Sequence, residues 1–358
     1  MSVSRLPSRS SGPSSAQATL GLDLTGLGVN PSSDGFSADL PVEKANLAKL
    51  ASYTRAAHDG GLSFVSIGEQ FRLRSDRALR TDAWLDPVVA ARRISPHAGA
   101  AGLVATVPIQ GADLGLVAGE LAQVTRAGGT WAGLELAGHA GSADALANTL
   151  AGVSRSFPSA RAGSQRAPRP QVVVPVGTES EIELAGEFAD VVRIREHDLE
   201  WARELRYAVR ASARAAGRQD VRVLVDLHTV VSADRQAAEE RAALVADIAG
   251  ENAPWTGALS AVGTACDVAD VIQTWVRAGA ADGFVVLPGS LPADVVALLR
   301  GVVPELRARG LVSEQAVGNR APVRRPQDPG QARAASAAAR VGARPAARRG
   351  ALAAVPVA

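Results

Sequence analysis

Polar side chains that could bind a ligand or transfer a proton stand at the ends of short apolar runs in this sequence of 358 residues. They include carboxylates, hydroxyls, guanidinium groups and imidazoles, and they are Asp23, Thr25, Glu69, Gln70, Thr106, Gln110, Glu135, His139, Thr178, Ser180, Arg193, Arg195, His197, Asp226 and His228. If the runs are parallel strands of one barrel, these side chains meet at its carboxyl end, where barrel enzymes build their sites.

Metal and serine chemistry have little support. No two of the five histidines stand four residues apart, and neither HExxH nor the nucleophile sequence GxSxG is present. Cys266 is the single cysteine, which excludes an intrachain disulfide and a zinc site built from cysteines. We therefore expect no metal site.

Eight apolar runs would position the polar side chains, and most are continuous stretches of Val, Leu and Ile. They are Leu20–Thr25, Phe64–Ile67, Gly102–Pro108, Trp131–Ala137, Gln171–Val176, Asp190–Ile194, Val221–Val231 and Gly283–Leu287. Continuous runs are typical of parallel strands buried on both faces. Strand and helix alternate eight times, and no GxGxxG turn follows the first run. This pattern favours an α/β (β/α)8 TIM barrel over a doubly wound open sheet.

Helix start and stop signals separate the runs. Thr264 with Asp267 resembles a capping box, and Asp198 is a good N-cap residue. We expect helices over residues 42–58, 88–93, 198–216, 233–248 and 265–278, with short helices after Pro292 and Pro304.

The two ends of the chain differ from its body in composition. Residues 1–18 are Ser-rich, and residues 313–358 are Ala/Arg/Pro-rich with a local charge of +6 from eight arginines and two acidic residues. We expect both ends to be disordered and residues 19–312 to form the barrel. The basic tail has no interleaved aromatic residues, so nucleic-acid binding is not expected. The sequence shows neither a secretory signal nor a membrane span, and we expect a cytoplasmic protein.

Two stretches resemble one enzyme family. They are RTDAWLDPVVAARRISPHAGAAGLVAT at residues 80–106 and VGTACDVADVIQTWVRAGAADGFVVLPGSLPADVVALLRGVVPELRARGL at residues 262–311. Both look like the bacterial luciferase-like flavin-dependent monooxygenase superfamily, near its nitrilotriacetate/alkanesulfonate monooxygenase branch. The similarity extends over residues 20–311 and rests on caps, turns and barrel-closing contacts.

The resemblance implies a luciferase-like barrel and a flavin-dependent monooxygenase or oxidoreductase that acts on a small organic substrate. It implies reduced FMN supplied by a flavin reductase, with O2 as co-substrate, and relatives of the fold use a deazaflavin instead. Homodimers are common in the family. In this chemistry the cofactor carries the reaction, while the protein holds the ring and excludes water.

The resemblance also implies cofactor-binding positions. Thr106 matches a threonine under the isoalloxazine ring, although threonine is also simply a good strand former. Gly177, Thr178 and Ser180 form a turn that lies near the flavin phosphate in the family. The same turn could be an ordinary helix cap, because Glu179 and its acidic neighbours would repel a phosphate.

Glu69 is the carboxylate at the end of the second run, where the family often carries an acidic residue or histidine. It is our candidate catalytic residue. A surface carboxylate paired with Arg72 or Arg74 is an equally open interpretation.

Several departures from the family fall on its functional side. The segment between the fourth and fifth runs, residues 139–169, is short where the family has a long insertion that covers flavin and substrate. Aromatic content is 4%, low for a flavin site. The alternative function is therefore a non-catalytic barrel that has lost flavin binding and acts as a partner or binding protein.

Overall fold

The computed structural model describes residues 17–29, 44–74, 82–126, 130–137, 143–156, 169–250 and 255–312. The barrel predicted for residues 19–312 falls within this part of the chain. The predicted disorder of residues 1–16 and 313–358 lies outside the described residues.

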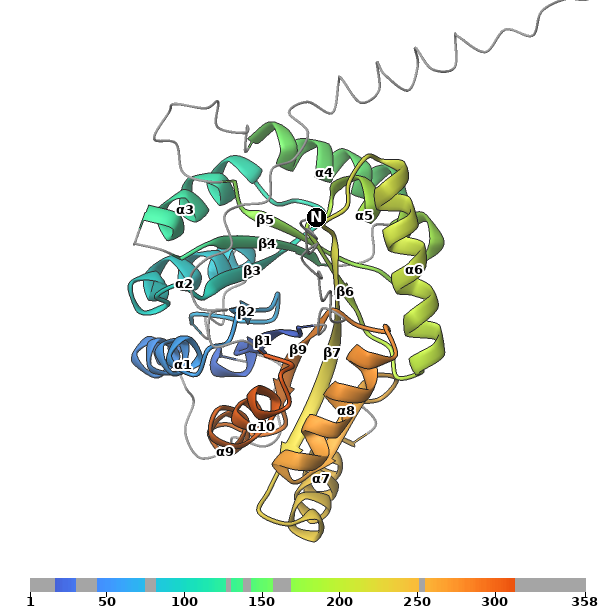
Figure 1. Ribbon diagram of the computed structural model, residues 1–358. Helices are drawn as coiled ribbons and strands as arrows, with labels where there is room; N and C mark the ends of the chain where they lie inside the picture. Colours follow the sequence, from blue (N-terminus) through green and yellow to red (C-terminus); the bar gives the residue numbers. More distant parts are fainter. Residues whose placement is uncertain are drawn as a thin grey trace, which may run out of the picture. The chain divides into compact units, whose positions relative to one another are not determined.

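Eight parallel strands close into a barrel, as predicted (Figure 1). They are β1 Thr19–Asp23, β2 Phe64–Ile67, β3 Gly102–Pro108, β4 Ala132–Ala137, β5 Gln171–Pro175, β6 Val191–Ile194, β7 Arg222–Val231 and β9 Gly283–Pro288. Each strand pairs with the next in this order, and β9 returns to pair with β1. An open doubly wound sheet is therefore excluded.

Helices cover the outside of the barrel in Figure 1. They are α1 Leu47–Asp59, α2 Asp86–Ile94, α3 Leu114–Arg126, α4 Ala143–Ser156, α5 Glu179–Phe188, α6 Leu199–Ala215, α7 Arg235–Ala249, α8 Ala265–Arg277, α9 Ala293–Ala297 and α10 Val303–Ala308. The main core fills the space between these helices and the outer faces of the strands. Among the described residues, no helix is long and apolar enough to cross a membrane.

Capping explains where the helix predictions were right and where they were wrong. The Thr264–Asp267 capping box and the Asp198 cap are present as predicted. The first helix begins at Leu47 rather than residue 42, because the Asn46 side chain accepts from the Lys49 N–H at 2.9 Å. Before it, Lys44 forms an isolated bridge with Arg74, which needs extended backbone. Likewise α7 begins two residues late, because Asp234 is its cap.

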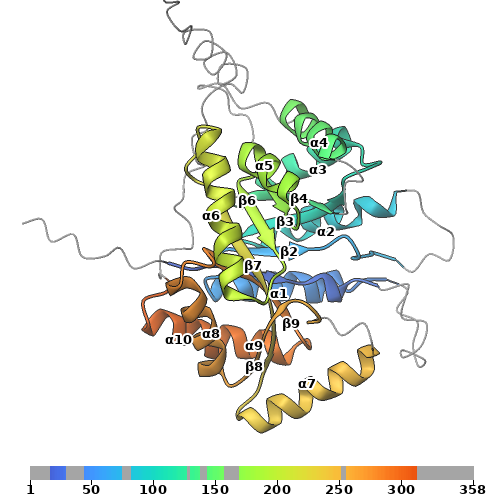
Figure 2. The same ribbon diagram turned by 90° about the vertical axis from the view of Figure 1, so that its right-hand side faces the viewer.

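A ninth strand, β8 Leu259–Gly263, was not predicted. It pairs with the second half of the ten-residue β7, beyond the point where β6 ends, and lies at the end of the sheet order. Helix α7 packs against β8 and extends away from the barrel (Figure 2).

The buried carboxylate of Asp294 anchors this extension. It accepts from the Val231 N–H at 2.8 Å, from the Ser290 N–H at 2.7 Å and from the Arg241 guanidinium of α7 at 3.0 Å. One side chain thus joins the end of β7, the segment after β9 and helix α7.

Candidate active site

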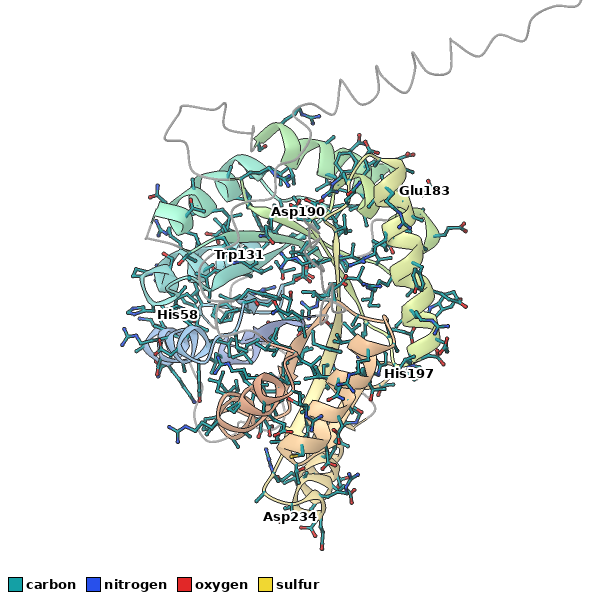
Figure 3. All side chains as sticks on the ribbon, viewed as in Figure 1. His58, Trp131, Glu183, Asp190, His197 and Asp234 are labelled. Carbon is teal, nitrogen blue, oxygen red and sulfur yellow. The ribbon has the colours of Figure 1, made fainter. Side chains whose placement is uncertain are left out.

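The barrel interior has an apolar layer near the amino ends of the strands. Side chains of six strands form it, and they are Phe64, Val104, Val173, Val191, Leu224 and Val285. Trp131 packs against this layer, with its ring centre 6.0 Å from that of Phe64 (Figure 3). Gly21 on β1 leaves the space for Phe64, because a Cβ at Gly21 would stand 2.1 Å from the ring. This layer closes the barrel below the carboxyl end of the strands.

About two residues further towards the carboxyl ends of the strands, the interior becomes polar. Side chains alternate between the two faces of a strand, so a residue two positions after an interior one also points inward. The strand register agrees, since Asp23 pairs with Ser66 and Thr106 pairs with Glu135. The members of this polar layer are Asp23, Ser66, Thr106, Glu135, Arg193 and Asp226, with His228 one inward step above Asp226.

Arg193 lies at the centre of the polar layer. Its Nε donates to Asp226 Oδ1 at 2.5 Å and its Nη1 to Glu135 Oε2 at 3.1 Å. Its Nη2 lies 4.0 Å from Asp23 Oδ2. Three carboxyl groups therefore surround one guanidinium.

Burial and charge act in opposite directions on these groups. Burial disfavours the charge of Arg193, yet the carboxylates of Asp226, Glu135 and Asp23 hold its pKa well above the usual value. Burial raises the pKa of Glu135, and Arg193 offsets only part of that rise. The guanidinium is thus firmly charged, and Glu135 takes up a proton more readily than an ordinary glutamate.

Three buried polar atoms of this region have no hydrogen-bond partner within the described residues. They are Ser66 Oγ, Thr106 Oγ1 and His228 Nε2. Burial, assisted by the positive charge of Arg195, lowers the pKa of His228 to about 4, so the imidazole is neutral at pH 7. Buried polar atoms are normally paired, and unpaired ones indicate a ligand, a water or a functional role.

Of the predicted cofactor residues, Thr106 lies in this polar layer. Gly177, Thr178 and Ser180 are exposed at the start of α5. There, Glu181 Oε2 accepts from the Gly177 and Thr178 N–H groups at 2.9 Å each. The backbone donors suited to a phosphate thus already bind a carboxylate of the same chain.

The predicted catalytic residue Glu69 is exposed just after β2. Arg72 donates to the Glu69 backbone carbonyl. His197 is exposed at the start of α6 and away from the barrel interior (Figure 3), while the Asp198 side chain caps that helix. Asp198 therefore serves as a helix cap, and His197 takes no part in the barrel interior.

The sequence showed Asp23, Glu135, Arg193 and Asp226 at strand ends but not that they form one cluster. A signal was present, because Arg193, Asp226 and Ser66 are polar residues within mostly apolar runs. Within the part of the chain that the structure describes, no three His, Cys, Asp or Glu residues are grouped to hold a metal ion.

Comparison with known proteins supports the fold. No protein-family model and no curated protein sequence matches the chain. Among solved structures, EDTA monooxygenase from Chelativorans sp. BNC1 matches with a TM-score of 0.65 and 17% identity, over 83% of this chain and 95% of that one. Long-chain alkane monooxygenase matches with a TM-score of 0.61 and 13% identity, over 84% and 93%.

A third structure, the coenzyme F420 dependent tetrahydromethanopterin reductase from Methanopyrus kandleri, has a TM-score of 0.57 and 12% identity, over 81% of this chain and 99% of that one. The chain thus shares the barrel fold of these three enzymes, and the resemblance seen in the sequence is confirmed at the level of the fold.

Proposed function

We propose that the barrel is a flavin-dependent monooxygenase or related oxidoreductase, which uses reduced FMN from a flavin reductase and O2 on a small organic substrate. The observation that supports this proposal most directly is the set of unpaired polar atoms buried at the carboxyl end of a closed barrel. The shared fold supports the proposal, since two of the proteins with this barrel are monooxygenases by name. A deazaflavin would suit the same fold.

The polar layer fits the ring of such a cofactor. A flavin ring carries hydrogen-bonding groups along one edge and is apolar elsewhere. Thr106 Oγ1 and Ser66 Oγ are free to donate or accept there, and neutral His228 offers Nε2. The apolar layer below keeps water out from that side. When bound, the flavin supplies the redox chemistry, and the chain's part is to orient the ring and shield it.

Binding of the phosphate group of FMN would require one rearrangement of the chain. Gly177, Thr178 and Ser180 would hold the phosphate only if Glu181 left their backbone N–H groups. Glu69, exposed beyond β2, is the proposed polar catalytic group, acting on a substrate that approaches from the carboxyl end.

A second candidate function is a non-catalytic barrel that acts as a partner or binding protein. One observation favours it: the Glu181 carboxylate already satisfies the donors that a phosphate would use. A barrel that no longer binds FMN gains a stable helix start from this arrangement.

A flavin titration separates the two candidates. The purified chain is titrated with FMN, oxidised and then anaerobically reduced, while fluorescence and absorbance are followed. Saturable binding of reduced FMN at micromolar concentration supports the oxidoreductase. No binding in either redox state by a folded, monodisperse sample supports the non-catalytic barrel.

Two substitutions locate the binding. Thr106→Val should weaken reduced FMN binding about tenfold, the loss of one well-placed hydrogen bond. The matched control is Thr229→Val, because Thr229 is also buried and unpaired but points out of the barrel. Equal effects of the two variants would remove Thr106 from the site. Thr178→Glu should likewise weaken FMN binding, and no change would leave the turn as a helix cap.

A further inference from the structure

The charges of the polar layer do not balance. Asp23, Glu135 and Asp226 face one guanidinium, that of Arg193. Nearby positive charge does not correct this within the described residues. The Arg195 guanidinium is exposed and donates to the Thr256 carbonyl at 3.1 Å, and His228 is neutral at pH 7. An excess of carboxylates in a buried interior is costly unless a proton or a cation joins them.

A second, independent observation points to a ligand. Ser66 Oγ, Thr106 Oγ1 and His228 Nε2 are all at least nine-tenths buried and unpaired, and all face the same interior. Hydroxyl oxygens and the unprotonated nitrogen of a neutral imidazole accept hydrogen bonds. The layer therefore combines surplus negative charge with unused acceptors.

A protonated amino group is the complement of that combination. It carries one positive charge and, for a primary amine, three N–H donors and no acceptor. The side chains of Asp23, Arg193 and Asp226 each remain 12% exposed, so the layer is reachable from the carboxyl end of the barrel. The apolar layer blocks the other direction, so an amine would enter with its charged end first.

We propose that this layer binds the ammonium group of a small organic amine, which occupies it in place of the flavin ring. Asp23 is the principal counter-ion, because its carboxylate is the one that Arg193 does not hydrogen-bond directly. Ser66, Thr106 and His228 accept from the ammonium N–H groups. This binding does not rest on the proposed function, because the amine and the flavin ring would use the same buried atoms in turn.

The test uses the full chain without flavin, so that its failure is distinct from failure of the flavin titration. n-Butylammonium, n-butanol and n-butyrate are titrated separately, and dissociation constants are measured by ligand-observed NMR. We expect n-butylammonium to bind at least tenfold more tightly than n-butanol, and n-butyrate not to bind. Equal binding of ammonium and alcohol, or no binding of the ammonium, would overturn the proposal.

Asp23→Asn tests the counter-ion. The amide keeps an oxygen that can accept from the Thr25 N–H, as Asp23 Oδ1 does at 2.9 Å, but removes the charge. n-Butylammonium should bind at least tenfold more weakly to this variant. The matched control is Asp234→Asn at the exposed start of α7, far from the layer (Figure 3), which should change nothing. Equal affinity of both variants for the ammonium would contradict the assignment.

Ser66→Ala is the second variant, used if Asp23→Asn does not fold. It removes an unpaired hydroxyl without changing charge, and it should weaken ammonium binding several-fold while leaving n-butanol unaffected. Unaltered ammonium binding counts against the proposal. A titration with MgCl2 alone completes the set: displacement of n-butylammonium by millimolar Mg²⁺ would assign the layer to a metal ion instead.

Discussion

The two interior layers of the barrel share the strands β2, β3, β6 and β7 and differ in almost every property. On β6, Val191 belongs to the apolar layer and Arg193 to the polar one, and on β7 Leu224 and Asp226 divide in the same way. One step of two residues along a strand thus separates a side chain that fills space from one that carries charge. The strands hold the side chains of both layers in place, so the two layers differ in their contribution to stability and to binding.

The apolar layer contributes stability. A fully buried aromatic or aliphatic side chain stabilises a fold by about 1.5–3 kcal/mol through burial alone. A buried ion pair contributes little net stability, since desolvation offsets the attraction between the charges. The polar layer is therefore expected to exist for binding, and removing the charge of Arg193 alone should cost more than removing it together with Glu135 and Asp226.

The largest effect is expected from breaking the polar layer at its centre. Arg193→Met leaves three buried carboxylates without their counter-charge and should lower the free energy of unfolding by about 3–5 kcal/mol, measured by urea denaturation. Arg203→Met on the exposed face of α6 is the control and should cost under about 1 kcal/mol. The triple variant Arg193→Met/Glu135→Leu/Asp226→Leu should recover most of the loss. A triple variant as unstable as the single one would contradict the comparison.

The next effect concerns the apolar layer. Phe64→Ala removes a ring that packs between Gly21 and Trp131 and should cost about 3 kcal/mol of unfolding free energy. Because the polar layer keeps its own contacts, affinity for reduced FMN should stay within about twofold. The control is Leu244→Ala on α7. This side chain is 59% exposed, so its removal should change the unfolding free energy little. A large loss of flavin affinity in Phe64→Ala would show that the layers are coupled.

A smaller effect should follow from pH. Because burial lowers the pKa of His228 to about 4, the unfolded chain binds this proton more readily than the folded one. The stability that neutral His228 contributes is complete above pH 6.5 and is lost as pH falls towards 4, by at most about 3 kcal/mol. His228→Gln cannot titrate, so the gap between the unfolding free energies of variant and parent should change across this window. A constant gap would show that the imidazole is not desolvated.

The smallest effect on stability is expected at the turn that leads from β5 into α5. Glu181→Gln keeps an oxygen for the Gly177 and Thr178 N–H groups but removes the negative charge. Stability should fall by about 0.5 kcal/mol or less, because the cap is retained in neutral form. FMN affinity should rise, since the amide is displaced by a phosphate more easily than a carboxylate and does not repel it. Weaker FMN binding would place the phosphate elsewhere.

Local pattern predicted the scaffold well, because continuous apolar runs and caps act over a few neighbouring residues. All eight barrel strands follow from those runs, and the Thr264–Asp267 box marks its helix start. The strand β8 was missed because its five residues are defined by pairing with the second half of β7, a contact between distant segments.

The polar layer shows the same limit. Asp23, Glu135, Arg193 and Asp226 come from four strands, and only closure of the barrel brings them together. Residue type and inward position follow from the sequence, whereas the pairing of Arg193 with two carboxylates depends on side-chain geometry. The roles of Glu69, Gly177, Thr178 and Ser180 stay predictions for the same reason.

Closure of the barrel also has a consequence for its synthesis. Strand β1 pairs on one side with β9, and Thr19 stands opposite Gly283, about 260 residues later in the chain. Until the ribosome has released β9, one edge of β1 and one edge of β7 have no partner, and exposed strand edges promote association between nascent chains. The last barrel strand to be translated is thus the one that protects the first, and a chain stopped before residue 283 should depend on chaperones to stay in solution.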